Sequence, residues 1–347
     1  MPAVSICVPT YNGAAYLREC LDSALSQTFE DFELLIIDDA SRDDTVAIAA
    51  EYSRADSRVR LCENPTNLGL VGNWNRCIDL ARGEWLKFLF QDDRLDRHCL
   101  ARMLMARVAG VLLVVCQRTV LFDPSAPAEL RHIYSRYVAK HNLSQRFPGS
   151  AVISAQSFSE RMVDYPLANC IGEPIATMIH RDAFRLYGTF HPYLIQLVDW
   201  EYQARVAVQT GLCYVDEPLA TFRVHGASST AVSMSAARSY RRDVIDELLI
   251  LHEIVYAPAY RTVREAASRR RPRINFHGRL LNAVDRAQLL ALEHHQVPEW
   301  REAARRYPKL RWASPPRRVK RWLTSSTLGP IVSVVRRFKR LRRGEVQ

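Results

Sequence analysis

Short apolar runs alternate with amphipathic segments of helical spacing along residues 1–95. The runs stop at polar residues, which is typical of parallel strands that are covered on both faces. We predict such strands at Val4–Val8, Glu33–Ile37, Arg58–Cys62 and Trp85–Phe90. The segments between them place apolar residues on one helical face and are joined by short links. This part of the chain therefore predicts an α/β fold with a mainly parallel sheet.

The second part of the chain has a looser pattern. Val111–Cys116 predicts another buried strand, and Asp199–Gln209 has the spacing of a helix. Cys213–Val215 and Ala220–Val224 predict two short strands. The segment 122–148 is polar and contains proline, so we expect a loop-rich excursion there. From residue 235 onward the pattern is helical and then strongly basic.

Three of the predicted strands lead directly into residues that can bind ligands. Pro9-Thr10-Tyr11-Asn12 follows the first strand, Asp38-Asp39 the second and Asp92-Asp93 the fourth. Ligands of open α/β sheets bind beyond the carboxyl ends of the strands, so one aromatic ring and four carboxylates should meet at one edge. The chain has neither a G-x-G-x-x-G after its first strand nor a G-x-x-x-x-G-K-[ST] motif. A dinucleotide-binding fold and a P-loop are therefore not indicated.

The composition is that of a globular protein. Of 347 residues, 48% are hydrophobic and 24% charged, which excludes collagen-like, coiled-coil and wholly disordered chains. The eight cysteines form no C-x-x-C pair, which favours buried thiols in a reducing cytoplasm over a disulfide framework or zinc site. We expect no signal peptide, because a strand-like run begins at Val4. We also expect no membrane span, because no apolar run approaches the required length.

The net charge of +11 is concentrated at the C-terminus. Residues 301–347 contain 15 lysines and arginines but only two glutamates, which leaves residues 1–300 slightly acidic at −2. In the tail 315–347, apolar residues after Pro330 share one helical face and arginines lie mostly opposite. A basic amphipathic helix with Trp and Phe indicates an anchor on an anionic membrane surface. A solvated or docking helix is the alternative, and nucleic acid is the least favoured partner.

Several motifs follow one another in a fixed order over roughly residues 3–230. They are Val4–Asn12, Ile36–Thr45, Asn67-Leu68-Gly69 with Asn75, Ala81–Glu84, Gln91-Asp92-Asp93, Gly172-Glu173-Pro174, Ile179-His180-Arg181, Asp199-Trp200-Glu201 with Arg205, and Phe222–His225. Each motif alone is weak, but their order and spacing together are specific. As a set they resemble glycosyltransferase family 2. The resemblance implies a GT-A fold, which is a Rossmann-like sheet flanked by helices, and an inverting, metal-dependent sugar transfer from a nucleotide sugar.

The resemblance also implies a division of the chain. Residues 1–234 would form the GT-A domain, with a donor-binding half at about 1–95 and an acceptor half at about 96–234. Residues 235–347 would form a helical C-terminal extension that ends in the basic tail 315–347.

Asp93 is the candidate metal ligand. Mn²⁺ or Mg²⁺ prefers carboxylate and phosphate oxygens, and one carboxylate together with the donor diphosphate can suffice. Asp92 would then hydrogen-bond the donor ribose or reach the metal through water. In some relatives a histidine at the place of His225 completes the metal shell. The structural alternative for the aspartate pair is a polar turn that closes a strand.

Asp39 is expected, from the resemblance, to accept a hydrogen bond from the donor base. Pro9 and Tyr11 are placed in the same nucleotide site, where Tyr11 could stack on any base. The alternative for the Asp38-Asp39 pair is a turn or helix entry with Ser41 as the N-cap.

Asp199 is the candidate general base, because the family has an aspartate six residues before an arginine on the same helix, here Arg205. Glu201 is the second choice for the base. The alternative is a carboxylate that the helix dipole stabilises whatever the chemistry; the same dipole would keep Asp199 ionised near neutral pH. Glu173, His180, Glu201 and Arg205 are assigned to the acceptor side.

The leading hypothesis is an inverting glycosyltransferase that transfers a sugar to a saccharide or polyprenyl-linked acceptor. It would serve bacterial surface polysaccharide synthesis at the inner face of the cytoplasmic membrane. A sugar nucleotidyltransferase is an alternative, but it should carry a Gly- and Lys/Arg-rich triphosphate loop, which Pro9–Gly13 lacks. A non-catalytic protein that uses the basic tail on membrane or RNA is the third possibility.

Overall fold

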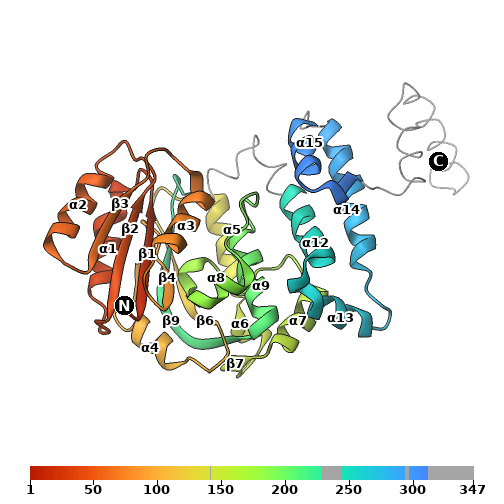
Figure 1. The fold of residues 1–347 in the computed structure, drawn as a ribbon, viewed down its shortest axis with the longest axis horizontal. Helices are drawn as coiled ribbons and strands as arrows, with labels where there is room; N and C mark the ends of the chain where they lie inside the picture. The colour runs from red at the N-terminus through yellow and green to blue at the C-terminus, as the bar shows by residue number, and fades with distance from the viewer. Residues whose placement is uncertain (141, 229–243, 294–296, 312–347) are drawn as a thin grey trace, which may run out of the picture. The chain divides into compact units, whose positions relative to one another are not determined.

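The computed structural model describes residues 1–140, 142–228, 244–293 and 297–311 (Figure 1). The chain divides into two compact units, Met1–His277 and Gly278–Gln347. The boundary expected after residue 234 lies outside the described residues, as does the basic tail 315–347. The first unit extends past that boundary, because the helices from residue 246 to residue 269 pack onto it.

The first half of unit 1 is a parallel sheet in the order β3-β2-β1-β4. Its strands and helices are β1 (Val4–Thr10), α1 (Ala14–Leu25), β2 (Phe32–Asp38), α2 (Thr45–Ala55), β3 (Val59–Glu63), α3 (Gly69–Leu80) and β4 (Trp85–Phe88). These are the four predicted strands, with ends that differ by one or two residues. Every residue of β1, β2 and β4 is buried, which explains their apolar composition.

The second half of the sheet is mixed. Its strands are β5 (Arg94–Leu95), β6 (Leu113–Phe122), β7 (Val152–Ile153), β8 (Thr177–His180) and β9 (Leu212–Val224). Strand β8 runs antiparallel to both β4 and β6, whereas β6 and β9 are parallel. The two short strands predicted near residues 213 and 220 form one continuous β9. The pairing shifts register around Gln117, opposite the polar stretch of β9 that suggested a break.

The segment 122–148 is largely helical, so the prediction of a loop-rich excursion was wrong. It contains α5 (Ala128–Lys140) and α6 (Leu143–Arg146). Pro127 stands immediately before α5, where a proline does not interrupt helical hydrogen bonds, and its carbonyl accepts from the Arg131 N–H at 3.0 Å. Asn142 caps α6 by accepting from the Gln145 N–H at 3.0 Å. The polar residues that suggested a loop are therefore helix-boundary residues.

The remaining helices of unit 1 follow the strands of the second half of the sheet or pack on the helices there. They are α4 (Cys99–Met105), α7 (Ala155–Asp164), η1 (Pro174–Ala176), α8 (Arg181–Tyr187), α9 (Val198–Thr210), α12 (Asp246–Tyr256), η3 (Pro258–Tyr260) and α13 (Arg261–Arg269). Helix α9 matches the predicted helix. Helix α7 packs against both α9 and α13, as Figure 1 shows. The first helices beyond residue 235 are thus part of the main unit.

Two further helices, α14 (Phe276–Glu293) and α15 (Val297–Arg306), and the short η4 (Pro308–Arg311) complete the described chain. The extension is helical where it is described. None of the described helices is long and apolar enough to cross a membrane. All eight cysteines are free thiols, and all but the half-buried Cys62 are buried, as expected.

Candidate active site

The loops after β1 and β2 are tied to each other at the carboxyl edge of the sheet. Asn12 (φ 47°) and Ala40 (φ 60°) both adopt the left-handed backbone region, which is uncommon for residues other than glycine. The Asn12 N–H donates to Ser41 Oγ at 2.9 Å, and Asn12 Oδ1 accepts from the Arg42 N–H at 2.8 Å. These bonds turn the chain sharply after each strand and leave both loops at one edge.

Asp38 and Asp39 have different environments. Asp38 accepts from the Ser41 N–H at 2.8 Å and from the Ser41 hydroxyl at 2.5 Å. Ser41 therefore bonds back to Asp38 and does not cap α2, which corrects the expected capping role. Asp39 is 2% exposed, and its carboxylate accepts from Leu68 N–H at 2.8 Å and Gly69 N–H at 2.9 Å. Asp39 thus holds the turn before α3 against the strand ends.

Tyr11 is the exposed aromatic residue of this edge, with 45% of its surface accessible. Its backbone is held on both sides by one side chain. Gln91 Oε1 accepts from the Tyr11 N–H at 2.8 Å, and Gln91 Nε2 donates to the Tyr11 carbonyl at 3.1 Å. A Cβ at Gly13 would lie 2.2 Å from Gln91 Oε1, so this position must remain glycine for the contact to form. The sequence analysis quoted Gln91 in its motif but gave it no role.

Asp93 is almost completely buried at the end of β4, with 1% of its surface exposed. One oxygen, Oδ1, accepts from the Arg223 N–H at 2.7 Å. The other, Oδ2, is buried and has no hydrogen-bond partner among the described residues. Burial, and next the charge of Asp92, raise the pKa of Asp93 well above its usual range. The site thus contains a buried carboxylate oxygen that accepts no hydrogen bond from the described residues.

Asp92 is joined to the end of β9. His225 Nε2 lies 2.8 Å from Asp92 Oδ2, and the Arg223 guanidinium donates through Nε to the Asp92 carbonyl at 2.9 Å. The ring of Tyr16 lies 4.9 Å from the His225 ring, centroid to centroid. The long β9 therefore returns to the strand ends and brings the predicted residues Asp92, Asp93 and His225 together.

These residues fit a divalent cation at Asp93. The unpartnered Oδ2 supplies a hard oxygen ligand, and a bound cation would reverse the unfavourable burial of the charge. Among the described residues, no group of three or more His, Cys, Asp and Glu side chains could hold a metal.

Asp199 lies in the first turn of α9 and is half-buried. Its Oδ1 accepts from the Trp200 N–H at 2.6 Å. Burial raises the pKa of Asp199 to about 7, although that backbone hydrogen bond opposes the shift, and the nearby charge of Glu173 raises it further. The expectation that the helix dipole would keep this carboxyl fully ionised near neutral pH was wrong, because the loss of hydration outweighs the amide contacts.

Glu173 acts electrostatically on both carboxylates. Its charge helps to raise the pKa of Asp93 and that of Asp199. Glu173 is paired with Arg118 of β6, whose side chain is only 4% exposed. Arg118 lies outside the motifs that identify the family in the sequence. A buried strand that changes from apolar residues to a single arginine was the available signal.

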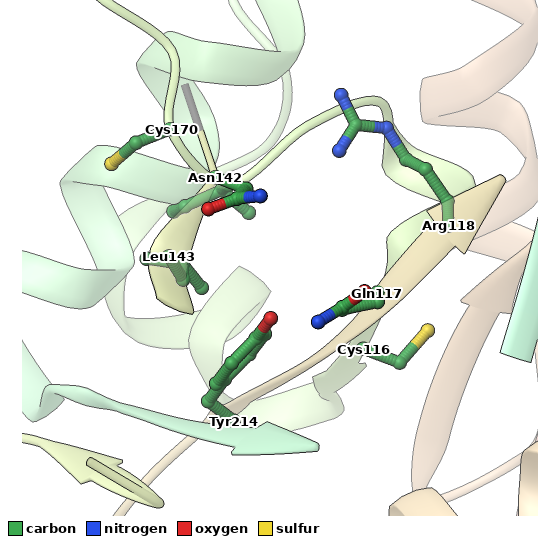
Figure 2. A pocket seen from close by; sticks show the side chains of 8 residues that line it. Cys116, Gln117, Arg118, Asn142, Leu143, Cys170 and Tyr214 are labelled. Atoms are coloured by element: carbon green, nitrogen blue, oxygen red, sulfur yellow. The ribbon is translucent and has the colours of Figure 1, made fainter. Parts of the chain in front are cut away.

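A small cavity of about 40 Å³ lies beside Arg118. Figure 2 shows Gln117 and Tyr214 on one side of it and Asn142 and Leu143 on the other. A cavity of this size accommodates one or two water molecules and no sugar ring. It therefore belongs to the polar packing behind Arg118 and does not itself form the donor or acceptor site.

Three residues assigned to the acceptor side are not at this edge. His180 pairs with Trp85 at the amino end of β4, opposite to Asp93, and its ring contacts Glu84 at 3.2 Å. Glu201 is only 1% exposed at its side chain, and it accepts from Tyr260 Oη at 3.0 Å and from Arg205 Nη2 at 2.8 Å. Glu201 is thus a packed structural residue and cannot serve as an accessible second base.

Arg205 has the same structural role. Its guanidinium donates to the carbonyls of Tyr187 and Thr189 as well as to Glu201, and so ties α9 to the loop after α8. Asp199 and Arg205 lie on the same helix as predicted, but the Arg205 side chain is bound within the packing beneath α9.

Replacing Glu201 with glutamine is expected to lower the free energy of unfolding by about 3 kcal/mol, because Arg205 would keep a buried charge without its partner. Urea denaturation measures this directly. Glu265→Gln is the matched control, since Arg261 and Glu265 form an exposed pair of the same i, i+4 spacing. It should cost less than about 0.5 kcal/mol. Equal stability losses in both variants would contradict the structural role of Glu201.

The profile of the family described as Glycosyl transferase family 2 matches residues 5–186, more than half of the chain. The chain belongs to glycosyltransferase family 2. Its enzyme class is therefore glycosyltransferase, which favours sugar transfer over both nucleotidyl transfer and a non-catalytic role.

This glycosyltransferase has curated relatives in several bacteria. It is 31% identical to the uncharacterized protein MT1568 of Mycobacterium tuberculosis over 77% of this chain and 80% of the relative. It is 27% identical to EpsH of Bacillus subtilis, named as a glycosyltransferase, over 73% of this chain and 67% of that one. A shorter stretch, 29% of this chain and 40% of the relative, is 42% identical to a PGL/p-HBAD biosynthesis glycosyltransferase of Mycobacterium bovis.

Solved structures show the same fold. The structure of S. aureus TarS 1-349 in complex with UDP-GlcNAc matches with a TM-score of 0.56 and 16% identity, and covers 88% of this chain and 91% of TarS 1-349. The mannosyltransferase PcManGT from Pyrobaculum calidifontis, in complex with GDP-Man and Mn2+, matches with a TM-score of 0.50 and 17% identity over 92% and 82% of the two chains. The glycosyltransferase thus has the GT-A fold expected from its sequence.

Proposed function

We propose that this glycosyltransferase transfers a sugar from a nucleotide-diphosphate sugar to a hydroxyl group of a saccharide or lipid-linked acceptor, with inversion at the anomeric carbon. The observation that carries the proposal is the buried Asp93 Oδ2, which has no hydrogen-bond partner among the described residues and directly follows Asp92, the residue joined to His225. The charge of Glu173 helps to raise the pKa of both Asp93 and Asp199, which supports a leaving-group site and a general base in one region.

The donor nucleotide is proposed to bind along the edge formed by the β1 and β2 loops. The exposed ring of Tyr11 can stack on the base, and Gln91 keeps its backbone in place. Asp39 is proposed to accept a hydrogen bond from the base. Pro9 is proposed to line the same nucleotide site, and Asp92 to hydrogen-bond the ribose. Asp39 is buried, and its carboxylate already accepts from the Leu68 and Gly69 N–H groups. A base that binds Asp39 would therefore have to approach it beside this turn.

The Asp93 carboxylate is proposed to hold Mn²⁺ or Mg²⁺ together with the donor diphosphate, and His225 is a second candidate ligand beside Asp92. When bound, such a cation supplies positive charge that neutralises the departing nucleoside diphosphate. Asp92 keeps its orientation through His225, and Arg223 fixes Asp93 through its backbone N–H.

The Asp199 carboxylate is proposed to take the proton of the attacking hydroxyl. The acceptor oxygen then forms a bond to the anomeric carbon from one face, while the bond to the diphosphate oxygen breaks on the other and its electron pair leaves with the nucleoside diphosphate. A base works best when its pKa is near the working pH, and a pKa of about 7 meets that condition.

A panel of UDP-, GDP- and dTDP-sugars with Mn²⁺ or Mg²⁺ tests the proposal. Binding can be followed by calorimetry, and release of nucleoside diphosphate can be followed with octyl glycosides or water as acceptor. We expect one nucleotide class to bind in a metal-dependent manner and chelation by EDTA to prevent binding. If the protein binds no donor under any of these conditions, the proposed function fails.

The rate of transfer should rise with pH through about 7, the pKa of Asp199, and level off above it. Below that pH the carboxyl is protonated and cannot accept a proton, so kcat should fall about tenfold per pH unit. Stability should change in the opposite direction. Between the ordinary value of 3.8 and about 7 the folded state binds a proton that the unfolded state does not, so ionisation costs stability as pH rises. A rate of transfer that does not change between pH 5 and pH 8 would contradict the assignment of Asp199 as the base.

The acceptor is proposed to be a cell-envelope glycan or glycolipid precursor at the inner face of the cytoplasmic membrane. A relative named for PGL biosynthesis supports a lipid-linked acceptor.

The basic tail 315–347 is proposed to hold the enzyme on anionic lipid, at about 1 kcal/mol per basic residue near the surface. Flotation with phosphatidylglycerol vesicles should lose most of the bound protein when residues 315–347 are deleted. Neutral phosphatidylcholine vesicles are the control, and equal flotation with and without the tail would exclude the anchor.

A further inference from the structure

The first turn of α12 is bound directly to the residues that begin α9. Asp246 is completely buried, with 0% of its surface exposed. Its carboxylate accepts from three consecutive backbone N–H groups of the other segment. These are Ile195 at 3.1 Å to both oxygens, Gln196 at 2.6 Å and Leu197 at 3.0 Å to Oδ2. Asp246 lies outside the residues matched by the family profile.

This contact fixes the backbone just before α9, a helix whose N-cap residue makes no side-chain cap of its own. Leu197 occupies the N-cap position of α9, and it has no polar side chain with which to cap the helix. The three N–H groups that meet Asp246 form a concave backbone site of the kind that binds anions. Hydrogen bonds from backbone N–H groups to an ionised carboxylate are about twice as strong as neutral ones. The Asp246 carboxylate therefore determines where the chain stands as it enters α9.

The position of the helix start decides the position of Asp199. The Leu197 carbonyl accepts the first helical bond of α9, from the Glu201 N–H at 2.9 Å. Asp199 lies within that turn, and its carboxylate is bonded to its neighbour Trp200 at 2.6 Å. A shift of the Ile195–Leu197 backbone would move the Asp199 carboxylate with it. A displacement of about 1 Å of a reacting group can cost about 100-fold in rate.

The rest of α9 is held independently of Asp246. Tyr260 Oη donates to the Glu201 carbonyl at 3.1 Å, and Thr262 Oγ1 donates to the Val208 carbonyl at 3.1 Å. These contacts secure the end of the first turn and the C-terminal part of the helix from η3 and α13. Loss of the Asp246 carboxylate should therefore loosen the entry to α9, before Glu201, while the helix remains in place.

We propose that Asp246 is a positioning residue for catalysis, which acts by holding the Ile195–Leu197 backbone and thereby the Asp199 carboxylate in the geometry needed for proton transfer. The proposal rests on the proposed function, because it takes Asp199 as the general base. It makes the first helix after the family-matched region part of the catalytic apparatus.

The test compares Asp246→Asn and Asp246→Ala in the full chain, using the donor selected by the panel and octyl glycosides as acceptors. Asparagine retains one carbonyl oxygen as acceptor, so we expect kcat to fall about tenfold, and about 100-fold with alanine. The donor dissociation constant and the KM for the donor should stay within twofold, because the donor edge is built from other strands. Glu247→Gln is the matched control, since it removes the same charge from the same helical turn, and it should leave kcat within twofold.

A double substitution separates positioning from general stability. In an Asp199→Asn background the base is already absent, so adding Asp246→Asn should change the residual rate by less than twofold. A structural role alone would lower the rate in both backgrounds and weaken donor binding as well. If the alanine variant does not fold, the asparagine variant and the double substitution decide the question.

The outcomes distinguish this inference from the proposed function. If Asp199→Asn stops transfer but folded Asp246→Asn and Asp246→Ala keep kcat within twofold of the unsubstituted enzyme, the positioning role is overturned and the proposed function stands. The positioning role is also overturned if the effects of Asp199→Asn and Asp246→Asn on the rate of transfer prove additive. If the unsubstituted protein binds no donor, or Asp199→Asn transfers at the full rate, the proposed function fails and the positioning role fails with it.

Discussion

Replacing Asp199 with asparagine is expected to slow sugar transfer by roughly 10²- to 10⁴-fold, the usual contribution of a positioned general base. Asparagine has almost the same shape and can still accept the Trp200 N–H, which lies 2.6 Å from the carboxylate in the native protein. The local structure should therefore persist while the proton acceptor is lost. Steady-state release of nucleoside diphosphate with octyl glycosides as acceptors measures the effect.

Donor binding should not change in the Asp199→Asn variant, because the donor is proposed to bind at the loops after β1, β2 and β4. Asp182→Asn is the matched control: Asp182 also lies in the first turn of a helix, α8, but its side chain is 45% exposed and pairs with Arg185. It should leave kcat within twofold. Transfer at the native rate by Asp199→Asn would refute the assignment of the base, whereas loss of donor affinity would show that Asp199 has a role on the donor side.

Replacing Asp93 with asparagine should remove the metal dependence of donor binding and lower the rate of transfer by about 10³-fold. Loss of several kcal/mol of transition-state stabilisation corresponds to that factor. The amide oxygen can still accept the Arg223 N–H, which lies 2.7 Å from Oδ1 in the native protein. The substitution thus removes the negative charge and leaves the contact with β9 in place.

The stability of the Asp93→Asn variant provides an independent measurement. Burial and the charge of Asp92 raise the pKa of Asp93, so without a cation the ionised carboxyl is unfavourable in the folded protein. A neutral amide removes that cost, and thermal unfolding in EDTA should show a variant at least as stable as the native protein. In Mn²⁺ the order should reverse, because only the native protein gains stability from the metal. Asp79→Asn, at an exposed position of α3, is the control. Equal stabilisation of both proteins by Mn²⁺ would place the metal elsewhere.

The strand-end residues could be predicted from the sequence because their positions follow from short-range patterns. Short apolar runs that alternate with amphipathic helical segments identify β1, β2 and β4. The carboxyl ends of such parallel strands lie at one edge of a sheet. Pro9, Asp39 and Asp93 are therefore brought to that edge by local order alone. Buried cysteines and the inward-facing Trp200 followed from the same patterns.

The environment of each side chain depended on residues far away in the sequence. Glu201 and Arg205 lie one helical turn apart and look like accessible charges, but Tyr260 and the loop after α8 bury them. His180 lies at the amino end of β4, away from Asp93, because β8 runs antiparallel to β4. No local sequence pattern specifies that direction. Pairing direction and burial arise from contacts over long sequence separations.

The sequence alone determined the fold family, the sheet edge at which the strand-end aspartates lie, and the concentration of positive charge in the last 47 residues. Those features are encoded by periodicity, motif order and composition, which need no knowledge of distant contacts. Only the tertiary structure decided that burial raises the pKa of Asp199 to about 7, that Arg118 pairs with Glu173 between the two halves of the site, and that Asp246 of α12 holds the start of α9. Hydration, ion pairing and capping depend on which surfaces meet in the folded chain, and that information is absent from any local stretch of residues.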